Sequence, residues 1–196
     1  MPRFLLAALA LASFAVAAPV PKAKKIAPHP HAVGTKWEYM HDGDEKEVWV
    51  EEISESKEKD GSITFKVDIT TATGAKMFET YRITDGQVEV IGDTDGEYTA
   101  PLVFRKGGWK DGDSWECSYT SGKLEYEQTV TVGKAEEITV AAGKYTAVPV
   151  TFKYAKPKGF SANTFWYADD VGMIRHTQEG RKEPVQELKA FTPGKK

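Results

Sequence analysis

The clearest structural signal in the sequence is the run TFWYADDVGMIR at residues 164–175. Two extended runs of aromatic and aliphatic residues flank a short Asp/Gly turn, a pattern typical of a β-hairpin. A second copy lies at residues 78–88, FETYRITDGQV. Adjacent residues of a strand point to opposite faces, so we expect Trp166 and Tyr167 to face opposite sides of the sheet.

Working outward from these hairpins, strand signals recur every 8 to 12 residues with turn residues between them. The cleanest runs through Ile63, Phe65, Val67 and Ile69, which alternate with polar residues. Residues 57–61, KEKDG, are predicted to form a charged loop. The sequence therefore predicts an all-β protein: an antiparallel meander of about 10–12 strands forming an open or half barrel, or a sandwich, with no long helix after the leader.

The chain is expected to contain one domain. Residues 1–17 have a positive start, an apolar run and an Ala-x-Ala site, which together predict a signal peptide cleaved after Ala17. Residues 18–32 hold four prolines and are predicted to be a flexible linker. Residues 33–192 form the predicted β domain. The product is expected to be exported, either periplasmic or secreted, and no later segment is apolar enough to span a membrane.

The domain shows signs of an internal repeat. Residues 34–39, GTKWEY, resemble residues 112–117, GDSWEC, and the two hairpins match in the same order. These matches suggest duplicated halves, 34–106 and 107–192. Under this pairing Cys117 takes the place of Tyr39, so we expect a buried and unreactive thiol. A single cysteine also excludes an intramolecular disulfide.

The composition argues against nucleic acid as a partner. The chain has 26 basic and 29 acidic residues, giving a formal net charge of −3 with both signs interspersed. A nucleic-acid-binding surface needs a basic patch or stripe, and none is evident.

The motifs of common enzymes and metal sites are also missing. There is no Gly-x-Ser-x-Gly motif, zinc spacing or phosphate loop. His29 and His31 are expected to be incidental residues of the linker, and His41 and His176 to decorate strand ends. Residues 93–97, DTDGE, resemble the start of a calcium loop but lack the later ligands.

Paired carboxylates could serve glycoside hydrolysis. Pairs such as Asp169-Asp170 and Glu51-Glu52 carry little weight, however, because neighbours in a strand point to opposite faces. We therefore predict a protein that is not an enzyme, with no catalytic or metal-binding residues and no cofactor.

The aromatic residues are the most informative about a binding role. They either fill a β-rich core or line an apolar cavity for a hydrophobic ligand. The five tryptophans are Trp37, Trp49, Trp109, Trp115 and Trp166. Individual ligand-binding residues cannot be chosen from the sequence.

Residues 137–147, EITVAAGKYTA, followed by Trp166-Tyr167-Ala168 and Val171-Gly172-Met173-Ile174, resemble a family of uncharacterised exported bacterial β proteins, some of them called TapB-like. More distantly, such proteins are similar to the open-barrel lipoprotein carriers (LolA-like), whose concave sheet binds acyl chains. The lid helices of a carrier are not visible in this sequence. The resemblance implies a non-catalytic exported domain that binds a ligand or an envelope component, or alternatively a lipid carrier. A hydrolase using Asp or Glu is the third hypothesis.

Overall fold

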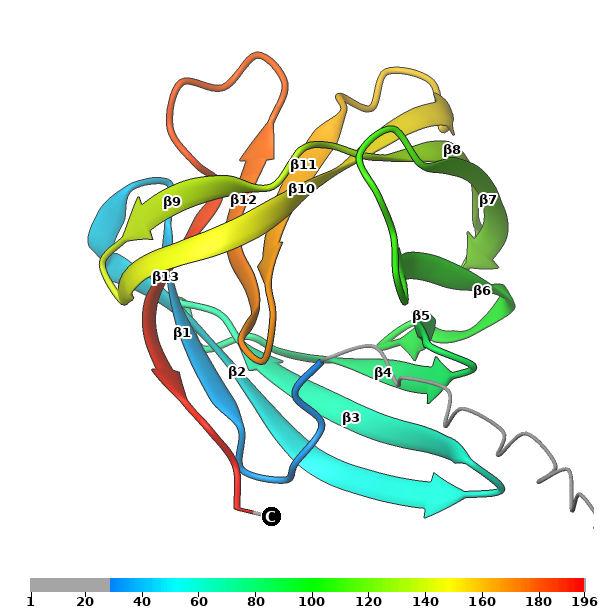
Figure 1. Ribbon diagram of the computed structural model, residues 1–196, viewed down its shortest axis with the longest axis horizontal. Helices are drawn as coiled ribbons and strands as arrows, with labels where there is room; N and C mark the ends of the chain where they lie inside the picture. Colours follow the sequence, from blue (N-terminus) through cyan, green and yellow to red (C-terminus); the bar gives the residue numbers. More distant parts are fainter. Residues whose placement is uncertain (1–28, 196) are drawn as a thin grey trace, which may run out of the picture.

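The computed structural model describes residues 29–195, and these residues form one antiparallel sheet that curls into a nearly closed barrel (Figure 1). Between those residues the chain has no helix. The strands are β1 (Lys36–His41), β2 (Asp44–Lys59), β3 (Ser62–Thr70), β4 (Lys76–Thr84), β5 (Gln87–Asp93), β6 (Gly96–Lys106), β7 (Ser114–Ser121), β8 (Leu124–Val132), β9 (Glu136–Val140), β10 (Gly143–Lys156), β11 (Asn163–Ala168), β12 (Gly172–Gln178) and β13 (Gln186–Thr192). The predicted leader, 1–17, and most of the predicted linker lie outside the described residues.

The barrel is an up-and-down meander in which the first strand, β1, pairs with the last, β13. The order is β6-β5-β4-β3-β2-β1-β13-β12-β11-β10-β8-β7, and β9 pairs with β10. β1 pairs with β13 from Lys36↔Thr192 to His41↔Gln186. The predicted all-β meander is confirmed as a barrel rather than a sandwich, with 13 strands where 10–12 were expected.

Tight Asp-Gly turns connect several of the strands. Asp42, Asp60 and Asp85 have positive φ angles of 53°, 51° and 47°, and each is followed by a glycine with positive φ. Two successive residues with positive φ make the type I′ turn, whose twist matches that of the flanking strands. The hairpin signals at residues 78–88 and 164–175 are confirmed as β4–β5 and β11–β12.

One predicted loop is wrong in extent. β2 continues to Lys59 and pairs with β3 as far as Lys59↔Ser62, so of the predicted loop 57–61 only Asp60 and Gly61 form the turn. The charged residues of this segment are largely exposed. Backbone pairing in a hairpin does not require apolar side chains, so hydrophobic alternation stops before the strand does.

A seam remains where β6 meets β7, since the backbone ladder does not cross it. Side chains bridge it instead. The Trp115 indole N–H donates to the Val103 carbonyl at 2.8 Å, and the Tyr98 and Tyr119 rings stack with centroids 4.7 Å apart. The barrel is thus continuous in packing but not in backbone hydrogen bonding.

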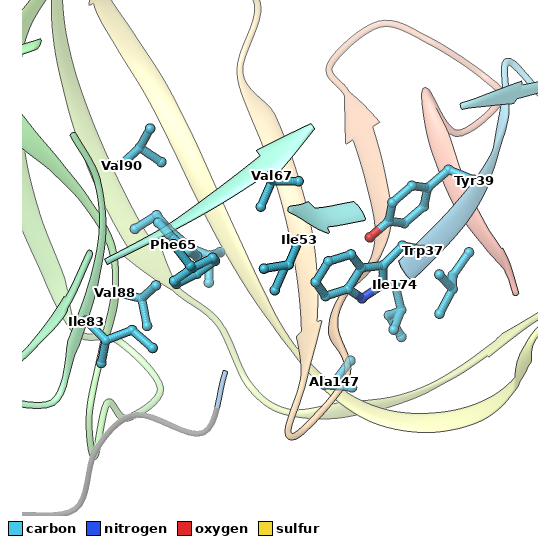
Figure 2. Packing of buried hydrophobic residues seen from close by; sticks show 14 of the residues in the cluster. Trp37, Tyr39, Ile53, Phe65, Val67, Ile83, Val88, Val90, Ala147 and Ile174 are labelled. Atoms are coloured by element: carbon cyan, nitrogen blue, oxygen red, sulfur yellow. The ribbon is translucent and has the colours of Figure 1, made fainter. Parts of the chain in front are cut away.

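Inward-facing residues of every strand form the core, and Figure 2 shows part of it. In this view Trp37 and Tyr39 lie on one side and Phe65 and Val88 on the other, with Val67 between them. All five are less than a tenth exposed. Alternation along β1 and β3 accounts for this arrangement, because every second residue points to the inside.

Candidate functional site

The barrel does not fill completely: it holds a half-enclosed cavity of about 200 Å³. An apolar cavity of about 150 Å³ is enough to admit benzene. The lining residues come from the N-terminal segment and from most strands of the barrel. They are His29, Trp37, Tyr39, Glu51, Val67, Glu79, Tyr81, Val90, Leu102, Phe104, Gln128, Phe152, Tyr154, Phe165, Tyr167, Gly172, Met173 and Gln186.

Three cavity tyrosines are placed by irregularities in strand pairing. The register shifts immediately before Tyr39 in the β1–β13 pair, before Tyr81 in β4–β5 and before Tyr167 in β11–β12. A β-bulge bends its strand and changes the direction of nearby side chains. Each of these bulges is therefore associated with an aromatic ring in the cavity wall.

Hydrogen bonds hold two aromatic rings of β1 in place. The Trp37 indole donates to the Val171 carbonyl at 2.6 Å, and the Tyr39 hydroxyl donates to the Met173 carbonyl at 2.9 Å. Both acceptors belong to the segment around the turn of the β11–β12 hairpin. This hairpin therefore anchors the wall of the cavity.

The expected orientation within the β11 hairpin is confirmed. Phe165 and Tyr167 line the cavity, whereas the Trp166 indole donates to the Glu136 carboxylate at 2.6 Å and is not part of the lining. Both alternatives that the sequence left open therefore apply: some aromatic residues fill the core, and others line the cavity.

Two carboxylates project into this largely aromatic space. Glu51 shares the inner face of β2 with the buried Ile53 and lies opposite Trp37 and Ile69 in the neighbouring strands. Burial, and then the charge of Glu79, raise the pKa of Glu51 to about 8. Burial also raises the pKa of Glu79, although a hydrogen bond from the Tyr81 hydroxyl opposes this effect.

The Glu51-Glu52 pair carried little weight in the sequence because the two side chains should point to opposite faces. They do diverge: Glu52 is exposed, and only Glu51 reaches the cavity. The sequence did contain a signal for Glu51: it lies between Trp49 and Ile53 at every second position of β2, so the three side chains share one face. A single acidic residue on an otherwise apolar face is unusual.

Gln128 is a third polar group in the cavity wall. Its side chain is 3% exposed, and neither its amide nitrogen nor its amide oxygen has a hydrogen-bond partner among the described residues. Buried amides are normally satisfied, and leaving one unpaired costs about 1–3 kcal/mol. This residue had no distinguishing signal in the sequence.

His29 lies in the cavity wall, a position that its place in the proline-rich segment did not predict. It was expected to be incidental, but its ring lies 5.6 Å from Phe65 and 5.9 Å from Phe104, measured between centroids. Its Nδ1–H donates to the Pro30 carbonyl at 2.8 Å. Burial lowers the pKa of His29 to about 4, so the imidazole is neutral at pH 7.

Of the other histidines, His41 lies at the end of β1 as expected, whereas His176 was wrongly expected at a strand end: it lies within β12, against the cavity wall. His41 stacks on Trp49 at 4.8 Å, and His176 stacks on Phe165 at 4.2 Å. Cys117 is buried as expected, and burial raises the pKa of its thiol. Asp93 Oδ2 accepts hydrogen bonds from the Tyr98 and Ser121 hydroxyls, as in a structural turn.

A buried cation links the seam side of the barrel to the β11–β12 turn. Arg105 is 2% exposed, forms an ion pair with Asp169 and lies over the Trp109 ring at 5.1 Å. Asp169 was considered only as part of a carboxylate pair, whereas its partner is this arginine. Among residues 29–195, no three His, Cys, Asp or Glu side chains converge as a metal site.

Comparison with known proteins supports the fold alone. No protein-family model and no curated protein sequence matches the chain. Two crystal structures are similar. One is a candidate exported protein with a YmcC-like fold from Bacteroides fragilis (16% identity, TM-score 0.57, covering 86% of this chain and 100% of that one). The other is a candidate lipoprotein from Parabacteroides distasonis (16% identity, TM-score 0.58, covering 85% and 99%).

These likenesses correct the family resemblance drawn from the sequence. They agree with an uncharacterised group of exported β proteins, but they support neither the TapB-like nor the LolA-like name. The motif behind those names lies in β9, the start of β10 and the β11–β12 hairpin, so its residues are those of strands and turns. Within the described residues, no helix is long and apolar enough to cross a membrane.

Proposed function

We propose that the protein is an exported, non-catalytic barrel that binds one small, mainly apolar molecule in its interior. The observation that carries this proposal is the cavity of about 200 Å³ with aromatic walls. Apolar pockets with a few convergent polar groups are the usual form of small-molecule sites. Eight-stranded barrels are known to hold a single small ligand in their interior.

Export rests on the leader-like residues 1–17 and agrees with the descriptions of the two similar structures. The alternative of a lipid carrier is less well supported, because the cavity is below the roughly 300–1,000 Å³ range usual for drug-sized ligands. A single ring or a short chain suits the volume better.

Calorimetric titration with benzyl alcohol tests the proposal. The wild-type protein should bind with 1:1 stoichiometry. Val67→Phe should abolish binding because Val67 lines the cavity and the larger ring fills it. Thr64→Phe is the matched control, since Thr64 alternates with the inward Ile63 and Phe65 and so faces outward.

Equal binding by the wild type and Val67→Phe would place the ligand outside the cavity and refute the proposal. Native mass spectrometry of the protein purified from exporting cells gives a second readout. A co-purifying small molecule that Val67→Phe loses would support a bound natural ligand.

A further inference from the structure

The Glu51 carboxylate has no counter-ion in the part of the chain that the structure describes. It makes no hydrogen bond or ion pair with any residue in 29–195, whereas Glu79 accepts a hydrogen bond from Tyr81. No lysine or arginine is among the residues that line the cavity. Glu51 is half-buried among apolar and aromatic side chains, where a charged carboxylate is costly unless something pairs with it.

Gln128 is an independent sign that a polar group is missing from the same cavity. Both polar atoms of its amide lack partners among the described residues, although only 3% of the residue is exposed. The amide oxygen can accept a hydrogen bond and the nitrogen can donate one. A ligand made only of hydrocarbon would leave both groups unsatisfied.

The walls around the carboxylates suit a positive charge. Trp37, Tyr39, Tyr81 and Tyr167 all border the cavity. The faces of such rings attract cations, and the attraction strengthens when the cation is desolvated. Arg105, the buried cation nearby, is already paired with Asp169.

We propose that the ligand is a small organic cation, an amine or quaternary ammonium group carried on an aromatic ring or short chain, with Glu51 as its counter-ion. This inference rests on the proposed function, because it names the chemical class of the molecule in the same cavity. Glu51 supplies the charge, the aromatic rings supply the apolar and cation–π contacts, and Gln128 offers a hydrogen-bonding group.

Binding should depend on pH through the cavity carboxylates. Glu51 must be ionised to pair with a cation, and burial raises its pKa to about 8. Affinity should therefore rise as the pH increases from 6 to 9, with a proton released on binding near pH 7. The ionisable groups that interact electrostatically with Glu51 are Glu79, Tyr39, Tyr81 and Tyr167. His29 lines the same cavity, Asp93 acts on Glu79, and Arg105 acts on His29 and Tyr167.

The test is calorimetric titration of the intact protein with three compounds that share one ring and differ in charge: benzyltrimethylammonium, benzyl alcohol and benzoate. The quaternary ion keeps its charge at every pH, so a pH dependence belongs to the protein. At pH 9 we expect the cation to bind about tenfold more tightly than the alcohol, and benzoate not to bind.

Glu51→Gln should lower the ratio of the affinity for the cation to that for benzyl alcohol from about ten to about one. Glu52→Gln, which changes the exposed neighbour, should behave as the wild type. If Glu51→Gln does not fold, the affinity of the wild type for the cation is measured from pH 6 to 9, and an affinity that does not rise with pH would overturn the inference. Glu79→Gln provides a second carboxylate variant for the same titration.

The possible outcomes separate the two proposals. Equal affinity for all three compounds, tighter binding of benzoate, or a cation preference that Glu51→Gln retains would overturn the inference and leave the ligand-binding barrel intact. No binding of any of the three compounds would count against both.

Discussion

Glu51 is an acidic side chain held among aromatic rings, and its environment has a consequence for stability. Its ordinary pKa of 4.5 rises to about 8 in the folded protein. Between these values the folded state keeps a proton that the unfolded state has released. The contribution of Glu51 to the free energy of unfolding therefore falls as the pH rises from about 4.5 to 8.

Glu51→Gln should relieve this loss, since glutamine has the same shape and no charge. We expect the variant to be more stable than the wild type by roughly 1–3 kcal/mol at pH 8.5, less than the full shift implies because the carboxylate borders an open cavity. At pH 4.5 the two proteins should differ little. Urea unfolding at both pH values measures this, and an equal gain at both would contradict the account.

The neighbours Trp166 and Tyr167 should respond differently to truncation. Tyr167 lines the cavity and lies 5.5 Å from Phe104 between ring centroids, whereas Trp166 lies on the outer face beside Glu136. We expect Tyr167→Ala to cost about 2–4 kcal/mol and Trp166→Ala about 1 kcal/mol. Thermal or urea unfolding decides, and a larger loss for Trp166→Ala would contradict the assigned faces.

At the scale of elements, the β6–β7 seam should be the least protected part of the barrel wall. Its strands meet through side chains, with Trp115 donating to the Val103 carbonyl at 2.8 Å. Backbone amides without a hydrogen-bonded partner strand exchange with solvent through local openings that cost little free energy.

Hydrogen exchange should therefore be faster on the facing edges of β6 and β7 than in β1–β3. Trp115→Phe removes the bridging N–H and should accelerate exchange there further, at a cost of about 1 kcal/mol in the free energy of unfolding. Trp49→Phe, away from the seam, is the control. Uniform protection around the barrel would show that the seam is sealed by other means.

Alternation and turn chemistry predicted most of the elements from the sequence. The inward residues of β3 and the turn at Asp85-Gly86 were both recognisable, because period-two patterning and Asp-Gly pairs act locally. The end of β2 was not recognisable, since its last residues are charged on both faces. The duplication of the two halves stays a prediction.

The candidate site was much less predictable than the fold. The bulges before Tyr39, Tyr81 and Tyr167 depend on the partner strand as well as on local sequence. Gln128 becomes notable only when the barrel leaves its amide unpaired. His29 follows no periodic pattern, so its position beside Phe65 came from tertiary packing alone.

For the whole molecule, a ligand in the barrel interior must lie beside His29. Its ring lines the cavity, so His29→Ala should enlarge the space and favour larger aromatic ligands. We expect 2-naphthylmethanol to gain at least about threefold in affinity relative to benzyl alcohol, as removal of buried atoms leaves a cavity. His31→Ala is the control, and calorimetry is the measurement. No change in this ratio would separate His29 from the site.

The most direct test of the binding cavity is a nuclear magnetic resonance titration of isotope-labelled protein with benzyl alcohol. The account predicts saturable shifts confined to residues that line the cavity, including Trp37, Glu51, Tyr81 and Tyr167, and their loss in Val67→Phe. Shifts confined to the outer faces of the strands, or no saturable shift at all, would contradict it.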